Sequence, residues 1–149
     1  MKLRLAVVAA VLAVAACASQ TTTTEPVVYS LAQAADSVQI RVGETISVEG
    51  TRIQFEAVVS DSRCAMDVVC VWEGDAAVQI SAQQGADTQL MQLHTTLEPH
   101  NSTAHGYRIE LLSVSPYPRA ATPTRPDSYS VWLRIVRVPQ QRELPEASH

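Results

Sequence analysis

The sequence predicts an all-β protein: a single antiparallel β-sandwich with Greek-key-like connections, or a small barrel of about seven strands. Three observations support this fold class. Short segments of alternating apolar and polar residues recur at spacings of about ten residues, with turn residues between them. No stretch after residue 37 has a convincing helical period. About 130 residues follow a predicted N-terminal signal, which is enough for one hydrophobic core and too few for two.

The predicted strands begin in the segment SVQIRVGETISVEGTRIQFEAVVS, which the turns VGET and VEGT divide into three. In its last part the residues alternate, with Ile53, Phe55, Ala57 and Val59 on one face and polar residues on the other. Four further strands are predicted at Ala76–Ala82, Thr88–His94, Tyr107–Ser115 and Ser128–Val138. Two irregular connections, Thr95–Gly106 and the proline-rich SPYPRAATPTRP, separate the later strands, as a Greek key would require.

The N-terminus has the layout of a secretory signal. Met-Lys-Leu-Arg is followed by twelve apolar residues, Leu5–Ala16, and then by Cys17. As a helix these twelve would span roughly 18 Å, too little to cross about 30 Å of bilayer hydrocarbon. Val14-Ala15-Ala16-Cys17 resembles the lipobox of bacterial lipoproteins. The resemblance implies cleavage before Cys17 and its modification with diacylglycerol and an amide-linked acyl chain such as palmitate; an ordinary secreted signal with an incidental cysteine is the alternative.

This interpretation divides the chain into four parts. Residues 1–16 are a removed signal peptide, 17–37 a lipidated cysteine with a Thr-rich tether, 38–138 the β domain and 139–149 a polar tail. Ala18 stands where the enterobacterial pattern for inner-membrane retention has Asp, which favours the outer membrane facing the periplasm. The mature chain would have nine Arg and no Lys against fifteen acidic residues, a net charge of −6. A basic face for nucleic acid is therefore not expected.

Cys64 and Cys70 form an even pair once Cys17 is assigned to the lipid. In an oxidising compartment they predict a disulfide, which the chain-entropy model values at about 2.4 kcal/mol. The spacing is unlike the CxxC of redox or zinc sites, so a thiol or metal site is the weaker alternative. Trp72, two residues later, is expected to cover the edge of the core next to the sulfurs.

The pattern DSRC…C.W.G around this pair, with VGE upstream and YRIELLSVSPYP downstream, resembles a group of small uncharacterised bacterial envelope proteins and lipoproteins. The resemblance covers Val38 to Val138 and implies a β fold without an established activity. A proline commonly follows the first cysteine in that group, whereas this chain has Ala65.

Two clusters are candidates for metal binding. Asp61, Asp67, Glu73 and Asp75 flank the cysteines and could bind a hard cation, although surface charge or pairing with Arg63 explains them better. His94, His100 and His105 lie within twelve residues and could hold zinc or copper, but their spacing matches no common motif. The sequence predicts no cofactor.

Trp132 and Tyr117 are the candidates for an interaction surface, because they fall on a polar strand face and in a loop. No activated nucleophile or placed acid–base pair is evident, so enzyme activity is not expected. The sequence therefore predicts a lipid-anchored, non-enzymatic binding or structural module of the cell envelope, attached to the membrane by its lipid and binding another envelope protein. The alternatives are a periplasmic metal-binding protein that uses the three histidines, and an inhibitor of an envelope or host hydrolase.

Overall fold

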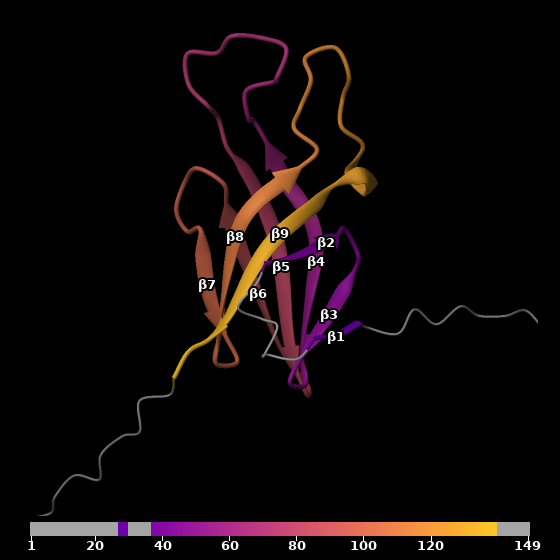
Figure 1. Cartoon of the computed structure of the whole chain (residues 1–149), viewed down its shortest axis with the longest axis vertical. Helices are drawn as coiled ribbons and strands as arrows, with labels where there is room; N and C mark the ends of the chain where they lie inside the picture. Colours follow the sequence, from indigo (N-terminus) through magenta and orange to yellow (C-terminus); the bar gives the residue numbers. More distant parts are fainter. Residues whose placement is uncertain (1–26, 30–36, 140–149) are drawn as a thin grey trace, which may run out of the picture.

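The computed structural model describes residues 27–29 and 37–139, and in them the chain forms a β-sandwich (Figure 1). Its strands are β1 (Val27–Tyr29), β2 (Val38–Arg41), β3 (Thr45–Val48), β4 (Thr51–Asp61), β5 (Ala76–Gln84), β6 (Asp87–His94), β7 (Asn101–Ala104), β8 (Tyr107–Ser115) and β9 (Ser130–Arg137). A single 3₁₀ turn, η1 (Pro126–Ser128), precedes β9. The predicted sandwich is thus confirmed, with nine strands in the described residues instead of about seven.

The strands form two sheets. The first has the order β1-β3-β4-β5-β6 and the second the order β2-β9-β8-β7. All pairings are antiparallel except that of β1 with β3, which is parallel. The chain crosses between sheets from β1 to β2, from β2 to β3 and from β6 to β7, and β9 returns to pair with β2.

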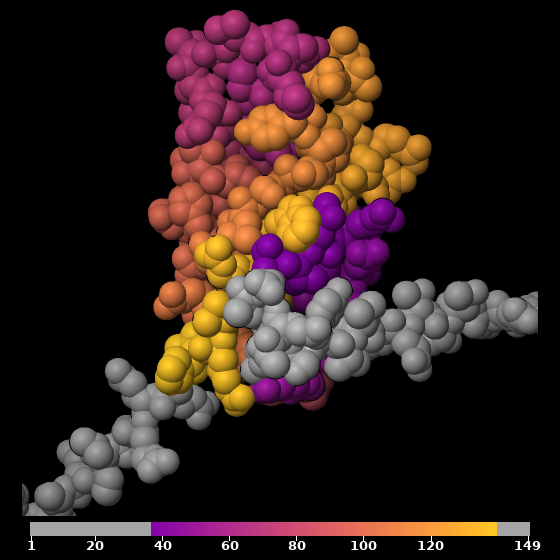
Figure 2. Space-filling view, viewed as in Figure 1, coloured from indigo at the N-terminus to yellow at the C-terminus, as the bar shows by residue number. Residues whose placement is uncertain are grey.

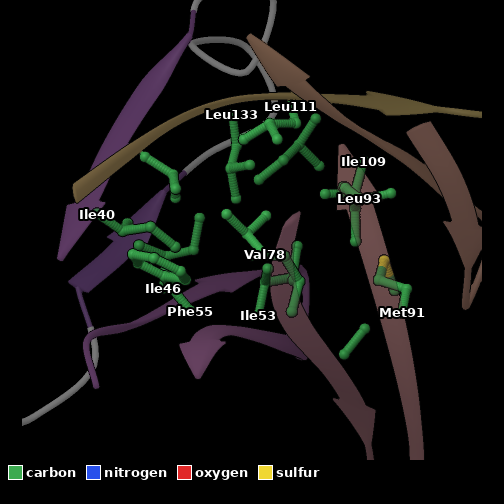
Figure 3. Close-up of a cluster of buried hydrophobic side chains, with 14 of the residues drawn as sticks. Ile40, Ile46, Ile53, Phe55, Val78, Met91, Leu93, Ile109, Leu111 and Leu133 are labelled. Atoms are coloured by element: carbon green, nitrogen blue, oxygen red, sulfur yellow. The ribbon is translucent and has the colours of Figure 1, made fainter. Parts of the chain in front are cut away.

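The core lies between the two sheets, where apolar side chains of both inner faces point toward one another (Figure 3). Phe55 and Val78 of the first sheet and Ile109 and Leu133 of the second are fully buried. Burying a side chain of this size stabilises the fold by about 1.5 to 3 kcal/mol each, so these contacts hold the sheets together. Alternate residues of β9, among them Leu133, are buried in this core.

The alternation predicted for β4 holds only in its first half. Ile53 and Phe55 are buried, but Ala57 and Val59 face solvent. Two irregularities in the pairing with β5, between Phe55 and Ala57 and between Val58 and Ser60, shift the phase of the strand. A bulge adds one residue and so exchanges the two faces beyond it, which a strict period of two cannot anticipate.

Two strands lie where none was expected. β7 falls within the connection predicted as Thr95–Gly106; its sequence, NSTA, lacks apolar alternation, and it is held by pairing with β8 at the edge of the second sheet. β1 falls within the predicted tether, 17–37, and pairs with β3. Edge strands bury little side chain, so their sequences carry a weak signal.

The loops between β4 and β5 and between β8 and β9 lie at one end of the sandwich, which we call the loop pole (Figure 1). The predicted signal peptide, Cys17, and most of the predicted tether and polar tail lie outside the described residues. Within 27–29 and 37–139, no helix is long and apolar enough to span a bilayer.

Candidate functional site

The two cysteines form the predicted disulfide at the loop pole. Cys64 and Cys70 are bonded, with their Cα atoms 5.9 Å apart. They lie in the loop 62–75, which joins β4 to its neighbour β5 in the same sheet. The disulfide therefore closes the end of a long hairpin, not a crossover between distant strands.

The base of this loop continues the pairing of β4 with β5. The backbone N–H of Ser62 donates to the Asp75 carbonyl at 2.7 Å, and that of Cys64 donates to the Glu73 carbonyl at 2.7 Å. Gly74 lies between these bonds with φ +74°, and a Cβ built on it would lie 1.9 Å from the Ser62 carbonyl oxygen. Only glycine allows the two backbones to approach so closely. This accounts physically for the glycine of C.W.G.

Arg63 is buried at the loop base and paired with Asp61. Its Nε and Nη2 donate to the two carboxylate oxygens of Asp61 at 2.8 and 2.7 Å, and the side chains are 3% and 8% exposed. Tyr129 Oη donates to Asp61 Oδ2 at 3.0 Å. Burial by itself raises the pKa of Asp61, but the hydrogen bonds and charge of Arg63 outweigh it and lower that pKa below its ordinary value.

Arg63 also ties the loop to the proline-rich connection 116–129. Its guanidinium donates to the carbonyls of Val114 and Pro116 and lies 4.6 Å from the centroid of the Tyr117 ring. Farther out, Met66 N–H donates to the Pro118 carbonyl at 3.0 Å. The backbone N–H of Ala120 donates to the Asp67 carboxylate at 2.8 Å. The two loops are thereby joined along much of their length.

Asp75 is a second buried carboxylate, on the other side of the loop base. Its Oδ2 lies 2.7 Å from His94 Nδ1, and its Oδ1 accepts hydrogen bonds from Thr95 Oγ1 and from the backbone N–H of Thr96 at 3.2 and 2.9 Å. Burial raises the pKa of Asp75, but the hydrogen bond with His94 and those from the backbone N–H groups of Thr96 and Leu97 lower it to about 2. For Asp61 the pairing with Arg63, one of the two interpretations that the sequence favoured, is confirmed. Asp75 is instead buried and bonded to His94, which neither interpretation anticipated.

The lowered pKa of Asp75 predicts loss of stability in acid. The carboxyl titrates at about 3.8 when unfolded and at about 2 when folded, so its contribution is complete above about pH 4. That contribution, about 2 kcal/mol, is lost as the pH falls through 2. Urea unfolding at about pH 6 and about pH 2.5 should show this fall, and Asp75→Asn should reduce it. Asp127→Asn, which removes an exposed carboxylate, should leave the acid-induced decrease in stability unchanged. If the decrease is equal in the Asp75→Asn and Asp127→Asn variants, its assignment to Asp75 is contradicted.

The three histidines of the predicted metal site do not come together. His94 bonds to Asp75, and His100 Nδ1 lies 3.0 Å from the His94 carbonyl oxygen. His105 bonds to the Ala82 carbonyl, whereas His94 is in register with Ala77. Five residues of strand separate these positions by about 16 Å. In the described parts of the chain, no group of three His, Cys, Asp or Glu side chains is placed to hold a metal ion.

Both ring nitrogens of His94 have partners. His94 Nδ1 faces Asp75, and His94 Nε2 lies 3.1 Å from Gln92 Nε2. The arrangement is that of a structural clamp that fastens the end of β6 to the start of β5.

The predicted interaction residues Trp132 and Tyr117 lie in a strand and in a loop. Trp132 is 37% exposed on the outer face of the second sheet, paired with Gln39 of β2, whereas Tyr117 stacks on Arg63 at the loop pole. The prediction for Trp72 is wrong, because its side chain is 62% exposed and does not cover the core.

The most exposed apolar residues of the protein that the structure describes lie in the disulfide loop. Val69 and Val71 are fully exposed, and Met66 and Trp72 are about two-thirds exposed. We call Met66, Val68, Val69, Val71 and Trp72 the apolar tip. Figure 2 shows this loop, in magenta, protruding at the loop pole beside the orange connection 116–129. Sequence analysis did not predict the tip because apolar residues near cysteines usually belong to the core. The short disulfide ring, which holds these residues away from the strands, was the feature that could have indicated their exposure.

Neither models of protein families, nor curated proteins, nor solved structures gave a match to this chain. Its function therefore has to be inferred from its own residues.

Proposed function

We propose that the protein is a lipid-anchored cell-envelope protein whose β domain is a non-enzymatic binding module, with the apolar tip as its binding element. The observation that carries this proposal is the exposure of five apolar side chains within seven consecutive positions, 66–72. Soluble proteins rarely expose apolar side chains in such a cluster unless it meets a partner. If a partner buried them fully, each of these side chains would contribute about 1.5 to 3 kcal/mol to the free energy of binding.

Attachment to the membrane is supported by the order of charged residues, apolar run and Cys17 at the N-terminus. One acyl chain alone binds a bilayer only marginally, but two or three chains on one residue hold firmly. We place the anchor in the outer membrane, with the domain in the periplasm, since Ala18 follows the cysteine.

One experiment tests both parts of the proposal. Cells producing the full chain are labelled with palmitate, and the detergent-extracted envelope is separated by size. We expect the wild type to be labelled and to elute in a complex, Cys17→Ser to be unlabelled, and Val69→Ser with Val71→Ser to be labelled but to elute as the free protein.

The control is Leu90→Ser. Leu90 is 64% exposed in β6, so this change removes an exposed apolar side chain away from the tip. We expect this variant to be labelled and to remain in the complex. A labelled Cys17→Ser variant would contradict the anchor, and a complex that survives loss of Val69 and Val71 would contradict the role of the tip.

A second candidate function is inhibition of a hydrolase, which the protruding, disulfide-closed loop favours. The Val68 N–H donates to the Ala65 carbonyl at 3.3 Å, so the loop turns between these residues. An inhibitor of this form would plug a cleft with side chains and would not lie extended across it as a substrate does.

A further inference from the structure

We infer that the apolar tip docks into a concave apolar cleft of another protein, and not into a lipid bilayer. The inference rests on the proposed function and specifies its partner. Three features of the loop pole favour a protein: the bracing of the loop, its charges and its position on the domain.

The loop is held in one shape before it meets a partner. The disulfide closes it, Gly74 lets its base pair closely, and Arg63 fastens it to the neighbouring connection. Contacts from Met66 and Asp67 to residues 118 and 120 hold it farther out. A rigid, convex loop loses little conformational entropy on entering a complementary cleft, which raises affinity for a protein. Insertion into a fluid bilayer does not require a fixed shape.

The charges of the loop oppose insertion into lipid. Residues 64–73 carry two carboxylates, Asp67 and Glu73, both exposed, and no basic side chain. Asp67 lies among the tip residues. Segments that lie in membrane interfaces are usually rich in Lys and Arg, which attract anionic lipids. A protein cleft with basic or hydrogen-bond-donating groups at its rim can instead pair with both carboxylates.

The tip also lies far from the point where the predicted tether joins the domain. Val27 is in register with Ile46, and Ile46 with Ile53, eight residues before the end of β4 at Asp61. Those eight residues cover about 26 Å, and the loop continues beyond them. The tip therefore lies at the far end of β4 from β1, away from the side of the domain on which the predicted anchor enters (Figure 1).

Photo-crosslinking in cells tests for the protein partner. A photoreactive residue is placed at Val69 or Val71 of the full chain, with Leu90 as the control position. We expect both tip positions to capture the same protein and Leu90 not to capture it. In a Cys64→Ser, Cys70→Ser background the tip stays exposed but loses its shape, so the yield should fall roughly fivefold or more. Capture that is equal at Leu90, or unchanged without the disulfide, would overturn the inference.

Fluorescence of Trp72 tests the lipid alternative. Trp132→Phe leaves Trp72 as the single tryptophan, since the sequence has two. The mature lipoprotein is reconstituted into vesicles of phosphatidylethanolamine and phosphatidylglycerol with or without brominated lipid. We expect equal Trp72 emission in both. Quenching by bromine would show the tip in lipid and overturn the inference while leaving the tip as a binding element. If the tip neither captures a protein nor is quenched by brominated lipid, the proposed function is overturned as well.

Discussion

Replacing Gly74 with alanine should destabilise the domain by more than about 4 kcal/mol, the largest effect expected of a single methyl group in this protein. The added Cβ would lie 1.9 Å from the carbonyl oxygen of Ser62 and 2.7 Å from its carbonyl carbon. Both are backbone atoms in a paired segment, so they cannot move away as a flexible side chain would. Relief requires the loop base to open, with loss of the Ser62–Asp75 and Cys64–Glu73 hydrogen bonds.

Gly43→Ala is the matched control for this substitution. Gly43 has nearly the same backbone conformation, φ +80° against +74° for Gly74, but a Cβ there would meet nothing within 4 Å. It should cost only the strain of a left-handed residue, about 1 to 2 kcal/mol. Urea unfolding of both variants measures the difference. Similar losses would mean that the loop base yields easily and that close packing at Gly74 contributes little.

Replacing Arg63 with methionine should cost about 3 to 5 kcal/mol, because it leaves the buried Asp61 carboxylate without its cation. The same change removes the donors that the guanidinium supplies to the Val114 and Pro116 carbonyls, and the charge that stacks on Tyr117. The two loops of the loop pole should therefore separate, and protease cleavage within residues 62–75 should increase along with the loss of stability.

Arg125→Met provides the comparison for Arg63→Met. Arg125 forms an ion pair with Asp127 at 2.7 Å, the same distance as in the Arg63–Asp61 pair. The side chains of Arg125 and Asp127 are 79% and 66% exposed, whereas those of Arg63 and Asp61 are 3% and 8% exposed. An exposed pair contributes about 0 to 1 kcal/mol, since water screens it and competes for its groups. We expect Arg125→Met to unfold at nearly the same urea concentration as the wild type. Equal losses in the two variants would show that burial of the Arg63 pair is not what makes it important.

Together these variants address the structure that presents the apolar tip. Gly74 and Arg63 belong to the DSRC…C.W.G pattern, and both act at the loop base and not at the tip itself. These two residues of the pattern hold the loop, whereas its tryptophan, Trp72, belongs to the apolar tip. The residues free to contact a partner are the exposed ones of the tip, such as Val69 and Val71.

Much of the fold followed from local pattern. The sequence predicted both β8 and β9, and the alternation in β9 also indicated its buried face, since a side chain in a strand has only two directions to point. The even pair Cys64 and Cys70 likewise predicted the disulfide from spacing and compartment. Such features depend on neighbours a few residues away, which the sequence displays directly.

Tertiary structure decided the rest, because the energies involved arise between residues distant along the chain. The bulges in β4 turned Ala57 outward through pairing with β5, and the polar strand β7 exists only as a partner of β8. Arg63 is buried because carbonyl groups about fifty residues later accept its hydrogen bonds. The sequence by itself determined most of the strands and the disulfide. Only the folded chain separated His105 from His94 and lifted the apolar residues beside the cysteines into solvent, since a short ring braced at its base cannot reach the core.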